Sequence, residues 1–153
     1  MGWNRWLLLV VLTWVPWLEL RGTIPLGLAW GMPWLPVVLV VLMANVLLFW
    51  PTWLVMSLFY ERWLQHTFVR DLLERARRRS EVAVERFGPI GLLLFVALPF
   101  PGTGAYTGTA LAYLAGMPVM KAFRSVAAGV LVDGVIITLL STGVITGVRW
   151  LSG

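Results

Sequence analysis

Residues 90–117, with the sequence IGLLLFVALPFPGTGAYTGTALAYLAGM, decide the fold. Residues 90–98 form a short apolar arm, residues 99–108 are rich in proline and glycine, and a second short arm ends at Gly116-Met117. A helix needs roughly 20 apolar residues to cross a hydrocarbon core about 30 Å thick. Because neither arm is that long, we expect a re-entrant hairpin that enters the membrane and leaves by the same face.

The first half of the chain has the same pattern 85 residues earlier. When the two halves are aligned at this offset, the Gly-Met-Pro of residues 31–33 aligns with that of residues 116–118, and Pro16 aligns with Pro101. We therefore expect a first re-entrant hairpin at residues 6–32, with its break in the polar stretch 19–25. If residues 3–18 instead span the membrane, the N-terminus changes sides.

One long apolar stretch follows each hairpin, at residues 33–60 and 122–148. At about 1.5 Å per residue, either would cover roughly 40 Å as a helix. A hairpin crosses zero times and a long helix crosses once, so the second repeat must be inverted relative to the first. The two tips would then meet near the midplane, with both termini outside.

Charged residues are scarce and concentrated in one segment. They make up only 12% of the chain, and residues 61–88 hold most of them, including seven arginines. Seven charges remain elsewhere: Arg5, Glu19, Arg21, Lys121, Arg124, Asp133 and Arg149. So few charges cannot cover a soluble domain, which excludes a soluble enzyme, a nucleic-acid binder and a disordered protein. They indicate a polytopic helical membrane protein.

The predicted fold is all-α, with two inverted repeats of one re-entrant hairpin and one transmembrane helix each. Repeat 1 covers residues 1–60 and repeat 2 covers residues 89–153. Residues 61–88 form a basic amphipathic connector on the cytoplasmic side, because cytoplasmic loops carry an excess of arginine and lysine.

Three charged residues fall in the membrane interior: Glu19, Arg21 and Asp133. A charge at that depth costs about 2.5–3.5 kcal/mol on insertion scales, so it is kept when it is paired, hydrated or functional. Glu19 could carry a proton, and Arg21 suits a fixed anion contact; the alternative is an ion pair that holds the tip together. Asp133 is either protonated or paired with Arg21 across the fold.

The second tip supplies further candidates for a substrate site: Gly102, Thr103, Gly104, Tyr106 and Thr107. Irregular backbone in a membrane has free N–H groups, and these could cradle an anionic group together with the hydroxyls of Thr103, Tyr106 and Thr107. Arg124 could attract an anionic headgroup or simply reach the interface. Gly108 and Gly116 are expected to pack against another helix, and Asn45 is expected to make an interhelical hydrogen bond.

Two motifs carry a family resemblance: ELRGTIPLG at residues 19–27 and PFPGTGAYTG at residues 99–108. They resemble the two signature tips of the family called putative small multidrug export proteins, which is similar to the wider DedA/VTT superfamily. That resemblance implies paired re-entrant hairpins and inverted symmetry. It also implies movement of polyprenyl phosphate or phospholipid with proton coupling, and gives Glu19 and Arg21 as the acidic and basic tip residues.

The predicted function is a transporter or lipid flippase with a proton-linked, anion-recognising site between the tips. The alternatives are an exporter of hydrophobic compounds of the small-multidrug-resistance type and a non-transporting membrane organising factor. The chain has no cysteine and one histidine, so we expect no metal, no cofactor and no enzyme activity. Expected partners are anionic lipids, protons and a second copy in a homodimer, in the cytoplasmic membrane of a bacterium or archaeon.

Overall fold

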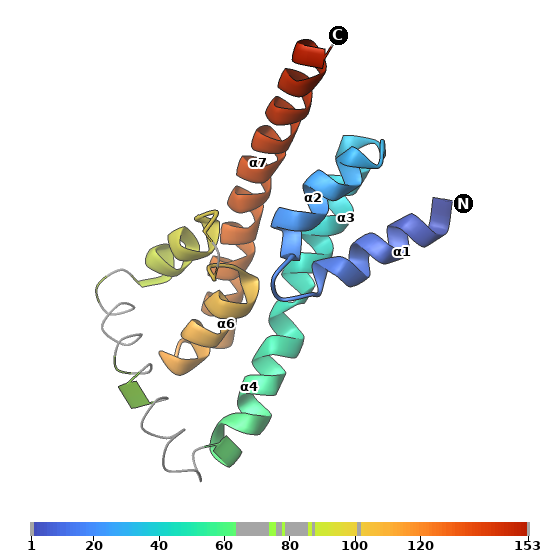
Figure 1. Ribbon diagram of the computed structural model, residues 1–153. Coiled ribbons are helices and arrows are strands. Elements are labelled where there is room, and N and C mark those ends of the chain that lie inside the picture. The colour runs from blue at the N-terminus through green and yellow to red at the C-terminus, as the bar shows by residue number, and fades with distance from the viewer. Residues whose placement is uncertain are drawn as a thin grey trace.

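The computed structural model describes residues 2–63, 74–75, 78, 86, 88–100 and 102–152, and all regular structure in them is helical. Most of the predicted amphipathic connector at 61–88 lies outside the described residues. Figure 1 shows the arrangement of the elements. They are α1 (Gly2–Thr13), α2 (Glu19–Ala29), α3 (Trp34–Leu47), α4 (Phe49–Trp63), the helix Gly88–Ala97, α6 (Ala105–Leu114) and α7 (Val119–Ser152).

Two segments are long and apolar enough to cross a membrane, Trp34–Tyr60 and Val119–Val144. They confirm the two long helices that the apolar stretches predict. In Figure 1, α3 and α4 descend while α7 rises beside them, so the two segments are antiparallel. Helix α7 continues past the predicted end, and its C-terminal part extends beyond the other helices.

The first long segment has a break at Leu48, between α3 and α4. The Leu48 amide donates to the Asn45 carbonyl at 3.1 Å, three residues back instead of four. Pro51 follows and has no N–H to donate to the Leu47 carbonyl, which explains why the regular pattern is interrupted here. The segment therefore consists of two helices joined end to end.

The first tip lies earlier than the sequence predicts. The prediction that residues 19–25 form the break is wrong, because the turn occupies residues 14–18 and α2 begins at Glu19. Pro16 disfavours helix at the residue before it and removes a donor. Pro25 lies inside α2, where its missing N–H leaves only one carbonyl without its helical donor, so proline content alone did not identify the break.

The second tip is shorter than predicted. The helix Gly88–Ala97 ends before Pro99, and α6 begins at Ala105. In the described part of this tip, irregular backbone is therefore confined to residues 98–100 and 102–104. Tyr106 and Thr107, which were expected in the irregular tip, lie in the first turn of α6.

Small residues let the helices approach closely. A Cβ at Gly27 of α2 would lie 2.8 Å from Val37 of α3, and one at Gly129 of α7 would lie 2.8 Å from the Leu93 carbonyl. A Cβ at Gly108 would collide with Val96, which confirms that Gly108 is a packing residue. Gly116 is not, because an added Cβ there meets nothing within 4 Å.

The real role of Gly116 is to end α6, and Gly31 ends α2 in the same way. Both have positive φ, 67° and 73°. The amide of Met32 donates to the Gly27 carbonyl at 3.2 Å, and that of Met117 donates to the Ala112 carbonyl at 3.0 Å. These are matching Schellman caps, and the two sets of residues are 85 positions apart.

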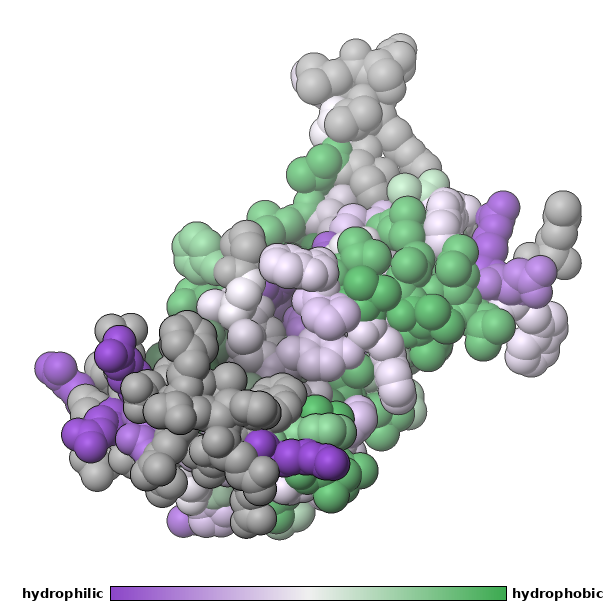
Figure 2. Space-filling model, turned by 60° about the horizontal axis from the view of Figure 1, so that its bottom comes forward, coloured by the Kyte–Doolittle hydropathy of each residue, from purple (hydrophilic) through white to green (hydrophobic). Residues whose placement is uncertain are grey.

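The outside of the molecule is apolar. Leu47, Leu58, Leu139 and Val144 are each more than half exposed on the long helices. Figure 2 shows hydrophobic residues over much of the visible face, with the most hydrophilic residues toward its ends. Such a surface is unsuited to water and suited to the hydrocarbon of a membrane.

Replacing either cap glycine should destabilise the fold. We expect Gly31→Ala and Gly116→Ala each to lower the free energy of unfolding by about 1–2 kcal/mol, because a Cβ is strained in left-handed backbone. Detergent-based unfolding titrations measure this loss.

Gly143→Ala is the matched control, because Gly143 lies in α7 with open space around an added Cβ. Alanine there should stabilise the helix by up to about 1 kcal/mol. Equal losses for all three substitutions would contradict the cap assignment.

Candidate functional site

Arg21 and Asp133 form a buried ion pair that joins the two halves of the chain. The Nε atom of Arg21, on α2, lies 2.9 Å from Oδ2 of Asp133, on α7. The side chains are only 18% and 2% exposed. Of the two alternatives for Asp133, the structure therefore has the pairing with Arg21.

The rest of the Arg21 guanidinium binds the second tip. Its Nη2 donates to the Leu98 carbonyl at 2.7 Å and to Thr103 Oγ1 at 3.1 Å. Its Nη1 donates to the Phe100 carbonyl. The Thr103 hydroxyl in turn donates to the Phe100 carbonyl at 2.9 Å. One side chain from the first half thus organises the irregular backbone of the second.

Electrostatics explains why the cation lies there. The carbonyl groups at the C-terminal end of the helix Gly88–Ala97 carry the negative end of its dipole, which favours a positive side chain. Arg21 also lies 3.4 Å from the Val96 carbonyl, within that last turn. Since Nε and both terminal nitrogens have protein acceptors, Arg21 acts in this conformation as a tie between the tips.

Glu19 also contacts the second tip. It is 7% exposed, and its Oε1 accepts a hydrogen bond from the Tyr106 amide at 3.5 Å. A Cβ at Gly104 would lie 2.9 Å from Glu19 Cδ and closer still to Oε2. Only glycine at position 104 leaves room for the carboxylate.

The Glu19 carboxylate occupies the N-terminus of α6. Unpaired amides and the helix dipole make such an end an anion site. The sequence predicts that this tip could cradle an anionic group, and in the structure the group is a side chain of the protein itself. Glu19 also has φ of 41°, an unfavourable conformation for a non-glycine residue that costs about 1–3 kcal/mol.

A second contact runs from the second tip back to the first. The Tyr106 hydroxyl donates to the Trp14 carbonyl at 2.5 Å. Within the first hairpin, Thr13 Oγ1 lies 3.1 Å from Thr23 Oγ1, and both hydroxyls are buried. The two tips therefore hold each other through reciprocal side-chain-to-backbone bonds.

Of the remaining residues predicted for the substrate site, one forms part of the second tip and two do not reach the meeting point of the tips. Gly102 has φ of 86° and forms the turn of the tip. Thr107 is exposed and makes no hydrogen bond through its side chain to the described residues. Arg124 is exposed on α7, and nine residues of helix, about 13 Å, separate it from Asp133. The structure does not bring Thr107 or Arg124 to the meeting point of the tips.

Asn45 lies in the first long helical segment, as expected, but without the hydrogen bond that the sequence interpretation assigned to it. It is completely buried in α3, and neither atom of its side-chain amide has a hydrogen-bond partner among the described residues. The predicted interhelical hydrogen bond is therefore wrong for this part of the chain. The sequence feature that could have indicated an unpaired amide is a single polar side chain in an otherwise apolar stretch.

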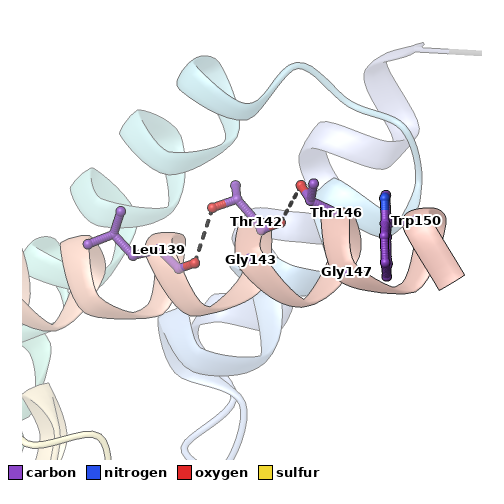
Figure 3. Close-up of a pocket in the computed structure, with 6 residues that line it drawn as sticks. All are labelled: Leu139, Thr142, Gly143, Thr146, Gly147 and Trp150. Atoms are coloured by element: carbon purple, nitrogen blue, oxygen red, sulfur yellow. Dashed lines mark hydrogen bonds between the residues drawn. The ribbon is translucent and has the colours of Figure 1, made fainter.

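The structure also has a shallow groove on the C-terminal part of α7 (Figure 3), lined by Leu139, Thr142, Gly143, Thr146, Gly147 and Trp150. Its threonine hydroxyls donate to carbonyls of their own helix, Thr142 to Thr138 and Thr146 to Thr142, both at 2.8 Å. Because its lining is uncharged and these hydroxyls are engaged, the groove is a weaker candidate than the tips. No group of three or more potential metal ligands occurs in the described residues.

Comparison with known proteins identifies a family for most of the chain. The sequence model of the family described as "Putative small multi-drug export protein" matches residues 19–136. The matched range starts at Glu19 and includes both Arg21 and Asp133. No curated protein and no solved structure matched the chain.

Breaking the ion pair from either side should be costly. We expect Arg21→Met and Asp133→Leu each to lower the free energy of unfolding by about 3–5 kcal/mol, because each leaves a buried charge unpaired. The double variant should lose less than the sum, since no unpaired charge remains. Unfolding titrations of the four proteins measure the coupling, with exposed Lys121→Met as control; strict additivity would contradict a buried pair.

Gly104→Ala should displace the Glu19 carboxylate and destabilise the protein. Adding Glu19→Ala removes the colliding atoms, so the double variant should be more stable than Gly104→Ala alone. Thermal unfolding in detergent measures both. Gly147→Ala is the control, because a Cβ there meets nothing within 4 Å. A Gly104→Ala variant as stable as this control would refute the close contact.

Proposed function

The chain belongs to the small multi-drug export protein family, and on that premise we propose that it is a proton-linked transporter with its substrate site between the two tips. The observation that carries the proposal is the Glu19 carboxylate at the N-terminus of α6, beside the buried Arg21–Asp133 pair. Charged residues this deep in an apolar fold mark transport or proton pathways by default.

We propose that the two halves are inverted re-entrant repeats, with a pseudo-two-fold axis through the tips. At the offset of 85 residues, Glu19 corresponds to Gly104, and the two are in contact. Two residues that are related by a two-fold axis can touch each other only if both lie on that axis. The matching Schellman caps of α2 and α6 support the same relationship.

The contacts of Arg21 and Tyr106, which also correspond at this offset, support it too. Arg21 donates to the carbonyls of Leu98 and Phe100 in the second tip. Tyr106 donates to the carbonyl of Trp14 in the first tip. Each tip thus receives a donor from the same position of the opposite repeat. Inverted repeats with broken helices at the midplane are typical of secondary transporters.

The proposed coupling is a competition at the N-terminus of α6. While Glu19 is ionised, its carboxylate satisfies the α6 dipole and amides. A protonated Glu19 carries no charge, so its attraction to that helix end weakens. An anionic group of a substrate then takes the place of the carboxylate. Proton uptake and anion binding are therefore linked through one site.

The surroundings indicate the class of substrate. Leu20 and Ile24 of α2 and Val96 of the helix Gly88–Ala97 are buried in the apolar core, and the outer surface is apolar. A molecule with one anionic group and a hydrophobic body fits these features, and an anionic lipid or polyprenyl phosphate is of that kind. Arg21 keeps the tips in register and would meet the anion once its own tip contacts open.

A second candidate is the export of hydrophobic cations in exchange for protons. The description of the family favours it, and an ionised Glu19 would then be the partner of the cation. In that case proton binding would expel the substrate, so the dependence of transport on pH would have the opposite sign.

The test is transport by the purified protein in proteoliposomes at a series of pH values, with two probes. One is a fluorescent phosphatidylglycerol and the other is ethidium, a hydrophobic cation. We expect the anionic lipid to move faster as the pH falls, and Glu19→Gln to make the rate independent of pH. Arg21→Gln should lose transport because the tips lose their tie.

Lys121→Gln is the matched control, since Lys121 is an exposed charge away from the tips; its rates should equal those of the wild type. Movement of ethidium alone would favour the second candidate. If neither probe moves, the proposal of transport for these two substrate classes fails and a membrane organising role is favoured instead.

A further inference from the structure

Asn45 is buried in the apolar interior, and its side-chain amide makes no hydrogen bond within the part of the chain that the structure describes. Its side chain is 0% exposed, and both its Nδ2 and its Oδ1 lack a hydrogen-bond partner among the described residues. A buried amide without partners costs about 1–3 kcal/mol. Asn45 is therefore either a defect of the packing or a ligand for something other than the protein.

Packing against α2 places Asn45 level with the first tip. Asn45 follows Val41 and Val37 at intervals of four, so the three share one face of α3. Val37 packs against Gly27 of the antiparallel α2. From this contact, Asn45 lies eight residues further along α3 and Glu19 lies eight residues back along α2, about 12 Å in each case.

Packing against α7 places Asn45 level with Asp133 as well. Leu42 of α3 packs on Gly134 of α7, where a Cβ would lie 3.2 Å from Leu42 Cγ. The helices are antiparallel, so Asn45 and Asp133 both lie below this contact, by about 4.5 Å and about 1.5 Å. The two residues are within about one turn of each other along the bundle.

The buried side-chain atoms without a partner thus gather in one layer. In the described residues they are Nδ2 and Oδ1 of Asn45 and Oδ1 of Asp133. The other carboxylate oxygen of Asp133 already binds Arg21. The Asn45 amide has two N–H donors and one acceptor, and Asp133 Oδ1 is a further acceptor. A water molecule between Asn45 Nδ2 and Asp133 Oδ1 gives each of these two atoms a partner.

We propose that Asn45 is part of the tip site and shares a buried water molecule with Oδ1 of Asp133. The water accepts a hydrogen bond from Asn45 Nδ2 and donates one to Asp133 Oδ1; its second hydrogen is free to pair with another acceptor. A metal cation fits less well, because Nδ2 needs an acceptor and the Arg21 guanidinium already brings a positive charge to the same carboxylate.

This assignment deepens the proposed function, and only its consequence for transport rests on it. A water at this point gives Asp133 a proton-conducting neighbour at the level of Glu19. Buried waters typically make about three hydrogen bonds to polar groups that the protein leaves unpaired. The water would therefore be a structural part of the site, bound in the absence of substrate.

The first test is infrared difference spectroscopy of the wild-type protein on a pH change, in ordinary water and in heavy-oxygen water. We expect an O–H stretching band that shifts in heavy-oxygen water, is lost in Asn45→Leu and is kept in Met43→Leu. Met43 is a matched control because it is on the same helix and 67% exposed. No such band in the wild type, or a band retained in Asn45→Leu, overturns the proposal.

The second test is thermal unfolding of the same variants. Removal of a truly unpaired amide by an apolar residue of similar size should raise the melting temperature. If the amide binds a water that it shares with Asp133, Asn45→Leu should lower it by a few degrees, while Met43→Leu leaves it unchanged. A raised melting temperature in Asn45→Leu overturns the proposal.

Neither test uses transport, so the two proposals fail separately. Loss of the pH-dependent lipid movement with the water band intact would overturn the proposed function alone. Transport that depends on Glu19 in the wild type, together with an unaltered water band in Asn45→Leu, would overturn the role of Asn45 alone.

Discussion

A largely buried guanidinium group in an apolar fold is the constraint on which the other features depend. Arg21 cannot release its proton, so its charge has to be compensated wherever the chain places it. Asp133 supplies the negative charge, and the carbonyls of the second tip accept the remaining hydrogen bonds. These contacts join α2, α7 and the backbone after the helix Gly88–Ala97. The positions of the tips therefore follow from the charge compensation and hydrogen bonding that Arg21 requires.

Compensation of charge by the opposite half of the chain also explains the position of Glu19. Its carboxylate lies on Gly104, the position that corresponds to it in the other half, and accepts the Tyr106 amide. A side chain from one half and a helix end from the other thus complete each other. The site therefore exists only where the halves meet, and a group that displaces Glu19 must also disturb their contact. This linkage is the physical basis of the proposed transport.

Several features could be predicted from the sequence because they depend on local chemistry. Apolar length identified both long segments, and isolated charges in apolar stretches identified Glu19, Arg21 and Asp133. The position of the first break could not be predicted, because Pro16 and Pro25 are equal in sequence terms. Packing of α2 between α3 and α7 keeps Pro25 helical. The positions of prolines in the sequence do not reveal that packing.

The sequence by itself determined that this is a helical membrane protein with a repeated pattern and three charges in its interior. Those results follow from hydrophobicity and chain length, which act residue by residue. Only the tertiary structure decided which groups meet: Arg21 with Asp133, and Glu19 with the end of α6. It also left the Asn45 amide without a hydrogen-bond partner among the described residues. Pairing of this kind depends on the register between helices far apart in the chain, and that register is set by packing.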